Sequence, residues 1–107
     1  MYQKIYDFCK VKNSGSVYKN GLEQTPREKW IINVLRTNNI DYIIDEFNLS
    51  EDNKCWNIIL PGSSKMSICA HHDIVNPNSD NANDNSASVI NAIMTHVLNP
   101  SITACIV

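Results

Sequence analysis

This sequence contains few glycines, and it lacks the excess of basic residues that a nucleic-acid partner requires. The 107 residues include three glycines, and none of them belongs to a phosphate-binding loop. Nine Lys and Arg residues stand against eleven Asp and Glu residues, which gives a formal net charge of -2. Because nucleic acids and anionic membranes attract a basic face, we expect neither as a partner.

Long apolar runs, a secretory signal and paired cysteines are also missing. No apolar run approaches the roughly 20 residues that span a bilayer, and the first residues, MYQKIYDFCK, lack the apolar stretch of a signal peptide. The four cysteines form no Cys-x-x-Cys motif. We therefore expect a cytoplasmic protein with reduced, structural thiols, in which Cys69 and Cys105 are buried as small hydrophobic residues.

Hydrophobic periodicity predicts a chain that combines helices and strands. The clearest helix covers 26–37, because Thr25 is a cap, Pro26 suits the first position and apolar residues follow at helical spacing. Asn38-Asn39 marks its end. The same criteria predict helices over 2–10 and 85–98, and strands over 40–48, 54–60, 66–70 and 102–107.

The connections between these elements predict the topology. A turn at 49–53 joins the first two strands into an antiparallel hairpin. The strand, loop, helix and strand of 66–107 predict a right-handed crossover between two parallel, buried strands. We expect one domain, with a helix and loop lead-in over 1–24 and an α/β core over 25–107. Its predicted architecture is a three-layer α/β/α sandwich around a mixed sheet.

A polar loop, 71–84, follows the third strand, at the sheet edge where α/β proteins bind ligands. Alternate residues of an extended chain face the same way, so His71 and Asp73 can share a side that His72 does not. Asp84 lies at the start of the next helix, where the helix dipole favours negative charge. His71 and Asp84 are candidate metal ligands, and Asp73 is a candidate acceptor for the other ring N–H of His71.

A structural interpretation of the same residues stays open. His-x-Asp occurs in surface loops without function, and an Asp before a helix often only caps it. His72 is a candidate substrate contact, but a simply exposed side chain is the more common case for such a histidine. His96 is expected in solvent on the polar face of its helix. Ser86 and Ser88 have no partners for a catalytic triad.

Two segments of the chain resemble the zinc aminopeptidase family that includes bacterial leucine aminopeptidases, carboxypeptidase Q-like enzymes and glutaminyl cyclases. They are Ala70-His71-His72-Asp73 and the run NANDNSAS at 81–88. The resemblance implies a zinc-peptidase-like fold in which His71 binds one zinc ion, Asp73 orients His71, and Asp84 bridges two zinc ions. It also implies that the substrate is a peptide or small amide, hydrolysed by metal-activated water.

The chain also departs from this family. Asn81 and Val89 stand where glycines are usual, and the loop between the two segments is short. The Glu-Glu pair that supplies the general base and a zinc ligand is absent, as are the later Asp or Glu and His. A catalytic zinc needs about three protein ligands and a water molecule. We therefore expect the N-terminal part of such a domain, truncated on its C-terminal side, which alone binds zinc weakly and does not hydrolyse peptides.

Two other functions fit the same residues. Glutaminyl cyclase-like acyl transfer, or hydrolysis of another amide, would use the same metal platform. A non-catalytic binding or structural module would keep the fold and lose the site. Metal binding and substrate profiling separate these three functions.

Overall fold

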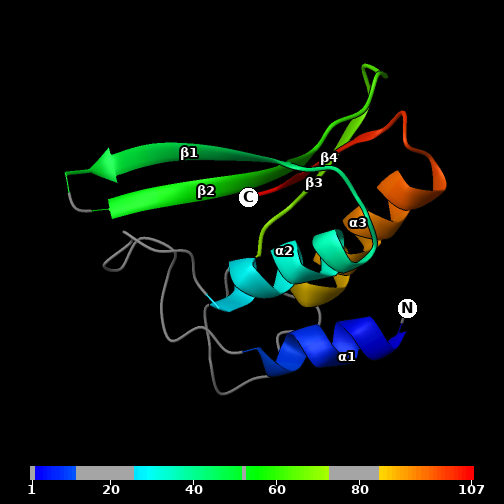
Figure 1. Ribbon diagram of the computed structural model, residues 1–107, viewed down its shortest axis with the longest axis horizontal. Coiled ribbons are helices and arrows are strands. Elements are labelled where there is room, and N and C mark those ends of the chain that lie inside the picture. The colour runs from blue at the N-terminus through cyan, green and yellow to red at the C-terminus, as the bar shows by residue number, and fades with distance from the viewer. Residues whose placement is uncertain (1, 12–25, 52, 73–84) are drawn as a thin grey trace.

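The computed structural model describes residues 2–11, 26–51, 53–72 and 85–107, which form a mixed four-stranded sheet and three helices (Figure 1). The strand order across the sheet is β1-β2-β4-β3. In chain order the elements are α1 (Tyr2–Lys10), α2 (Pro26–Thr37), β1 (Ile43–Ser50), β2 (Asn53–Leu60), β3 (Ser67–Ala70), α3 (Ala87–Leu98) and β4 (Thr103–Ile106). The predicted α/β class and the order of elements are therefore confirmed.

Helix α2 ends as its sequence predicts. Asn39 has a φ of 55°, the left-handed conformation that Asn tolerates better than most residues. The Ile40 N–H donates to the Leu35 carbonyl over 2.9 Å, and the Asn39 N–H donates to the Arg36 carbonyl over 3.2 Å. These two bonds form a Schellman motif, which satisfies carbonyls at the helix end and turns the chain toward β1.

Both predicted strand pairings are present. Strands β1 and β2 form an antiparallel hairpin in which Ile43 lies opposite Ile59. Strands β3 and β4 are parallel, and α3 forms the crossover between them. Strand β4 also pairs with β2 in the antiparallel direction, which places the last strand of this unit in the interior of the sheet.

All three helices lie on one side of the sheet in Figure 1. The strand residues that face them belong to the main core, including Ile58 and Leu60 of β2 and Ala104 and Ile106 of β4. Helix residues complete this core: Phe8, Ile31, Ile32, Leu35, Val89, Ile90, Ala92 and Ile93. The described elements therefore form two layers, a sheet and a helical layer.

The opposite side, here called the open face, carries the alternate residues of each strand. Ile43 and Phe47 of β1 are 54% and 39% exposed on it. Two predictions are wrong for this reason: β3 and β4 are not buried on both sides, since Cys69 is exposed and Cys105 half-buried. An apolar run in the sequence does not reveal that only one side of its strand is covered.

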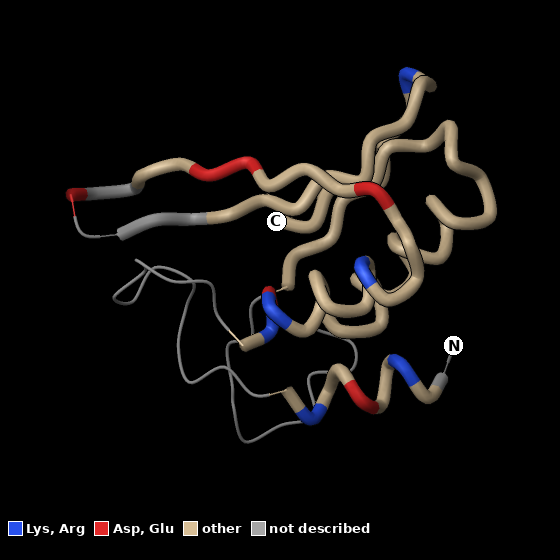
Figure 2. The backbone as a smooth tube through the Cα atoms, in the orientation of Figure 1, with Lys and Arg blue, Asp and Glu red and all other residues tan. Residues whose placement is uncertain are grey.

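Charged residues of both signs are spread over the described surface. Figure 2 shows Lys and Arg on α1, on α2 and in the turn before β3, and acidic residues along β1. No helix in the described ranges combines the length and apolar character needed to cross a membrane.

Candidate functional site

The hydrogen-bonded ladder of β3 continues past Ala70 into the predicted metal-binding motif. The Val107 N–H donates to the Ala70 carbonyl, and the His72 N–H donates to the Val107 carbonyl, each over 2.9 Å. These bonds keep residues 70–72 extended beside β4. Side chains therefore alternate here as within the strand.

This alternation places the two histidines on opposite sides. His71 is partly exposed and follows Cys69 on the open face, whereas His72 points to the helical side and is 1% exposed. The predicted separation of the two side chains is thus present. The expectation that His72 is exposed is wrong, because Ala70 and His72 belong to the face that the helices cover.

Arg27, in the first turn of α2, is the polar centre of this region. Its side chain is completely buried. Its guanidinium donates to the His72 carbonyl through Nε, to the Phe8 and Val11 carbonyls over 3.0 and 3.1 Å through Nη1, and to Ser86 Oγ over 3.0 Å through Nη2. It also lies 3.7 Å from the centroid of the Phe8 ring. One side chain therefore connects α1, the end of β3 and the start of α3.

The hydrogen bonds explain why a charged group is stable in this position. Removing an unpaired cation from water costs several kcal/mol, whereas a hydrogen bond to a charged group contributes about 1.5–3 kcal/mol. The planar guanidinium of Arg27 can donate hydrogen bonds to several acceptors at once. A lysine ammonium cannot do this with the same geometry. Packing against Phe8 adds a cation–π contact.

Ser86 immediately precedes α3 and is fully buried. It stands at the N-cap position but makes no side-chain capping hydrogen bond. Its hydroxyl instead accepts the bond from Arg27. Ser86 thus holds the helix start against α2, which is a structural role.

Two of the three histidines are buried, and His96 differs most from its expected position. Its side chain is 8% exposed, and its Nδ1 lies 2.6 Å from the Ile102 carbonyl oxygen. Because a carbonyl only accepts, Nδ1 carries the proton in this contact. The prediction of a solvated His96 is wrong: the residue connects the end of α3 to the chain that enters β4.

Sequence reasoning missed Arg27 and Glu28 as buried residues, although a signal for both was present. Arg27 precedes Ile31 and Val34 by four and seven residues, so it extends the apolar stripe of α2. Glu28 is also fully buried, and it precedes Ile32 and Leu35 by the same two intervals. A charged residue that lies at helical spacing from the buried apolar residues of its helix is therefore a candidate for burial.

Of the predicted site residues, His71 and His72 belong to the described part of the chain. Asp73 and Asp84, the predicted orienting and bridging carboxylates, lie outside it. Within residues 2–11, 26–51, 53–72 and 85–107, no group of three or more His, Cys, Asp or Glu side chains could hold a metal ion. Arg27 therefore connects His72 and Ser86, which lie near the two ends of the predicted loop, and the described residues supply one predicted ligand, His71.

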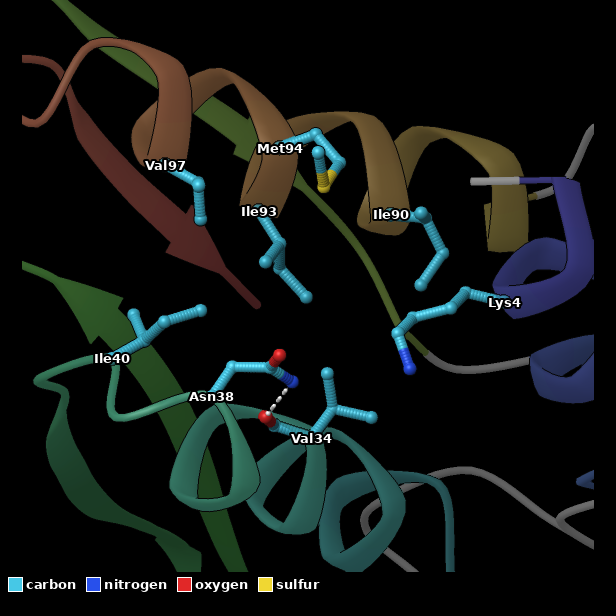
Figure 3. Close-up of a pocket in the computed structure, with 8 residues that line it drawn as sticks. All are labelled: Lys4, Val34, Asn38, Ile40, Ile90, Ile93, Met94 and Val97. Carbon is cyan, nitrogen blue, oxygen red and sulfur yellow. Dashed lines mark hydrogen bonds between the residues drawn. The ribbon is translucent and has the colours of Figure 1, made fainter.

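A cavity of about 260 Å³ between the helices is a separate feature (Figure 3). Its lining is mainly aliphatic, from Ile90, Ile93 and Val97 of α3 and from α2, with Lys4 at one side. The Asn38 side-chain amide donates to the Val34 carbonyl over 2.8 Å at its edge. Among the described residues, the lining contains no carboxylate, imidazole or thiol, which are the donors of the predicted metal site.

No protein-family profile and no curated protein matches the chain.

Proposed function

We propose that this chain is part of a zinc-dependent, aminopeptidase-like hydrolase domain. The observation that carries the proposal is the arrangement around Arg27. Of the two segments that resemble the zinc aminopeptidases, 70–73 includes His72 and 81–88 includes Ser86, and Arg27 donates to both of these residues. A strand end and a helix start are thereby held to one buried side chain, as a site built from both segments requires.

The imidazole and carboxylate groups of the two family-like segments suit zinc, which binds imidazole nitrogen and carboxylate oxygen. His71 would be a ligand, Asp73 would hold its second ring nitrogen, and Asp84 would supply the bridging carboxylate. Bound zinc polarises a scissile carbonyl and lowers the pKa of a water molecule. The described residues contribute one of these ligands, so the general base and further ligands would come from outside them.

The proposal includes a finer architecture and a place in a longer polypeptide. In a three-layer zinc-peptidase-like sandwich, a second helical layer packs on the face of the sheet opposite the first. The partly exposed apolar residues of the open face, Ile43 and Phe47 among them, support such a layer. In this proposal residues 1–107 are the N-terminal part of one domain.

Equilibrium dialysis against zinc tests metal binding in the chain itself. We expect weak uptake that is lost in His71→Ala and in Asp84→Asn. Asp41→Asn is the matched control, because Asp41 is exposed and lies before β1, outside both family-like segments. Absence of uptake by the unmodified chain, or equal uptake by all variants, favours the non-catalytic module instead.

Hydrolysis is tested in a polypeptide that continues into an acidic pair and the later ligands. There, His71→Ala and Asp84→Ala should abolish zinc-dependent cleavage of aminoacyl anilides. Undiminished activity in either variant contradicts the assignment. Release of a cyclised product from N-terminal glutaminyl peptides would identify the glutaminyl cyclase-like alternative on the same platform.

A further inference from the structure

Two cysteines stand side by side on the open face. Cys69 of β3 lies opposite Cys105 of β4 in the parallel pairing, and Cys105 lies opposite Ile59 of β2. Cys69 is exposed and Cys105 is half-buried, and both are free thiols. Burial, the neighbouring Cys69 and a side-chain hydrogen bond with Cys69 raise the pKa of Cys105. The strand register therefore places the two thiols next to each other on the same face of the sheet.

Such a pair can either form a disulfide or bind a metal ion through both sulfurs, and the spacing of the strands bears on which reaction is easier. Neighbouring strands lie about 4.7–4.9 Å apart, whereas a disulfide brings the β carbons to about 3.5–4.5 Å. The strand spacing lies within the Cα separation of about 4.4–6.8 Å that disulfides allow, but the β carbons of two registered cysteines would have to move closer together to form one. A zinc–sulfur bond is about 2.3 Å long, and bonds of similar length from two neighbouring strands about 4.7–4.9 Å apart can reach a single ion between them without that movement.

We propose that Cys69 and Cys105 form a two-sulfur site for a soft monovalent metal ion, Cu(I), on the open face of the sheet. Thiolates select soft ions such as Cu(I). On binding, each sulfur donates an electron pair to the ion and each thiol proton goes to water, while copper stays monovalent. No oxidant is needed.

The surroundings of the pair favour two-coordination. Ile59 occupies the neighbouring place in the same cross-strand row and offers no donor atom. His71 follows Cys69 on the open face, but it forms no three-donor group with the two thiols in the described part of the chain. Structural zinc sites are almost always four-coordinate. The site thus differs in donor atoms and in metal from the proposed hydrolase centre.

An anaerobic competition titration tests the site. The 107-residue chain is mixed with the coloured complex of Cu(I) and bicinchoninate, and loss of colour measures transfer of copper to the protein. We expect transfer of one equivalent, with release of about two protons per ion in weakly buffered solution. Cys69→Ser and Cys105→Ser should each lose the transfer. Cys9→Ser is the control, because Cys9 is buried in α1, and it should retain transfer.

Circular dichroism of each variant separates loss of the site from loss of the fold. Cys69 is exposed, so Cys69→Ser is expected to fold and decides the question even if Cys105→Ser does not. No transfer to the unmodified chain, or transfer that persists in folded Cys69→Ser, overturns the proposal. So does a loss of two free thiols that requires both Cys69 and Cys105 after treatment with oxidised glutathione, since that result identifies a disulfide pair instead.

Discussion

At the scale of single residues, Arg27 organises the chemistry-bearing end of the molecule. Its acceptors come from α1, from the end of β3 and from the start of α3. These segments are far apart in sequence, and apolar packing, which is non-directional, does not by itself orient their polar groups. A buried guanidinium orients these groups, because each of its N–H groups donates to an acceptor along a fixed direction.

Replacing this guanidinium should therefore cost much of the stability of the domain. For Arg27→Gln we expect the free energy of unfolding to fall by about 3 kcal/mol or more, since buried acceptors lose their donors. Urea denaturation followed by circular dichroism measures the change. Ser86→Ala, which removes one partner, should cost about 1 kcal/mol.

Lys29→Gln is the matched control for these variants. Lys29 is exposed on the same helix, and its replacement should change the free energy of unfolding by less than about 0.5 kcal/mol. If Arg27→Gln unfolds at the same urea concentration as Lys29→Gln, the hydrogen bonds of Arg27 do not hold the three segments together.

At the scale of elements, the turns decide how closely β2, β3 and β4 approach. Gly62 follows β2 and lies against the backbone of the segment that enters β4. Its N–H donates to Thr103 Oγ1 over 3.0 Å, and the Ser64 N–H donates to the Ser101 carbonyl over 2.8 Å. A side chain at position 62 has no room in this contact.

Gly62→Ala should consequently be destabilising. Its new Cβ would lie 2.7 Å from the Ile102 carbonyl carbon and closer still to the Ser101 oxygen, and both are backbone atoms. We expect a loss of about 1–3 kcal/mol in the free energy of unfolding, the usual cost of overpacking. Thermal denaturation measures it against Ser63→Ala, an exposed neighbour that should behave as the unmodified protein. Equal melting temperatures for the two variants contradict the close contact.

The elements themselves were largely predictable from the sequence. Periodicity and end signals located α2 within its exact bounds, and the crossover rule gave the parallel pairing of β3 with β4. The burial of His72 and His96 was not predicted, because a polar residue at the border of an apolar stripe can face either way until the packing partner is known. The predicted roles of Asp73 and Asp84 remain predictions, since both lie outside the described residues.

At the scale of the whole molecule, the sheet is covered on one side only in the described structure. A monomer that exposes large apolar side chains in one region offers a surface for other apolar groups. Ile43 and Phe47 belong to this open face, whereas Ile58 on the neighbouring strand is fully buried on the other. The two faces should therefore respond differently to the same kind of substitution.

The double variant Ile43→Thr/Phe47→Thr tests this difference. We expect the free energy of unfolding to change by no more than about 0.5 kcal/mol per substitution, while binding of the dye ANS decreases. Ile58→Thr is the contrasting variant and should cost about 2 kcal/mol or more, because it removes aliphatic carbon from the core and buries a hydroxyl group there. A strongly destabilised double variant would mean that the open face is covered.

The position of β4 in the sheet also bears on how the protein is made. Strand β4 is inserted between β2 and β3, both of which are synthesised earlier. While the chain emerges from the ribosome, the β1–β2 hairpin can form from local contacts, but the facing edges of β2 and β3 stay unpaired until β4 arrives. Unpaired edges join readily to strands of other chains. In the interval between synthesis of β3 and of β4, nascent chains therefore expose two strand edges at which aggregation can begin.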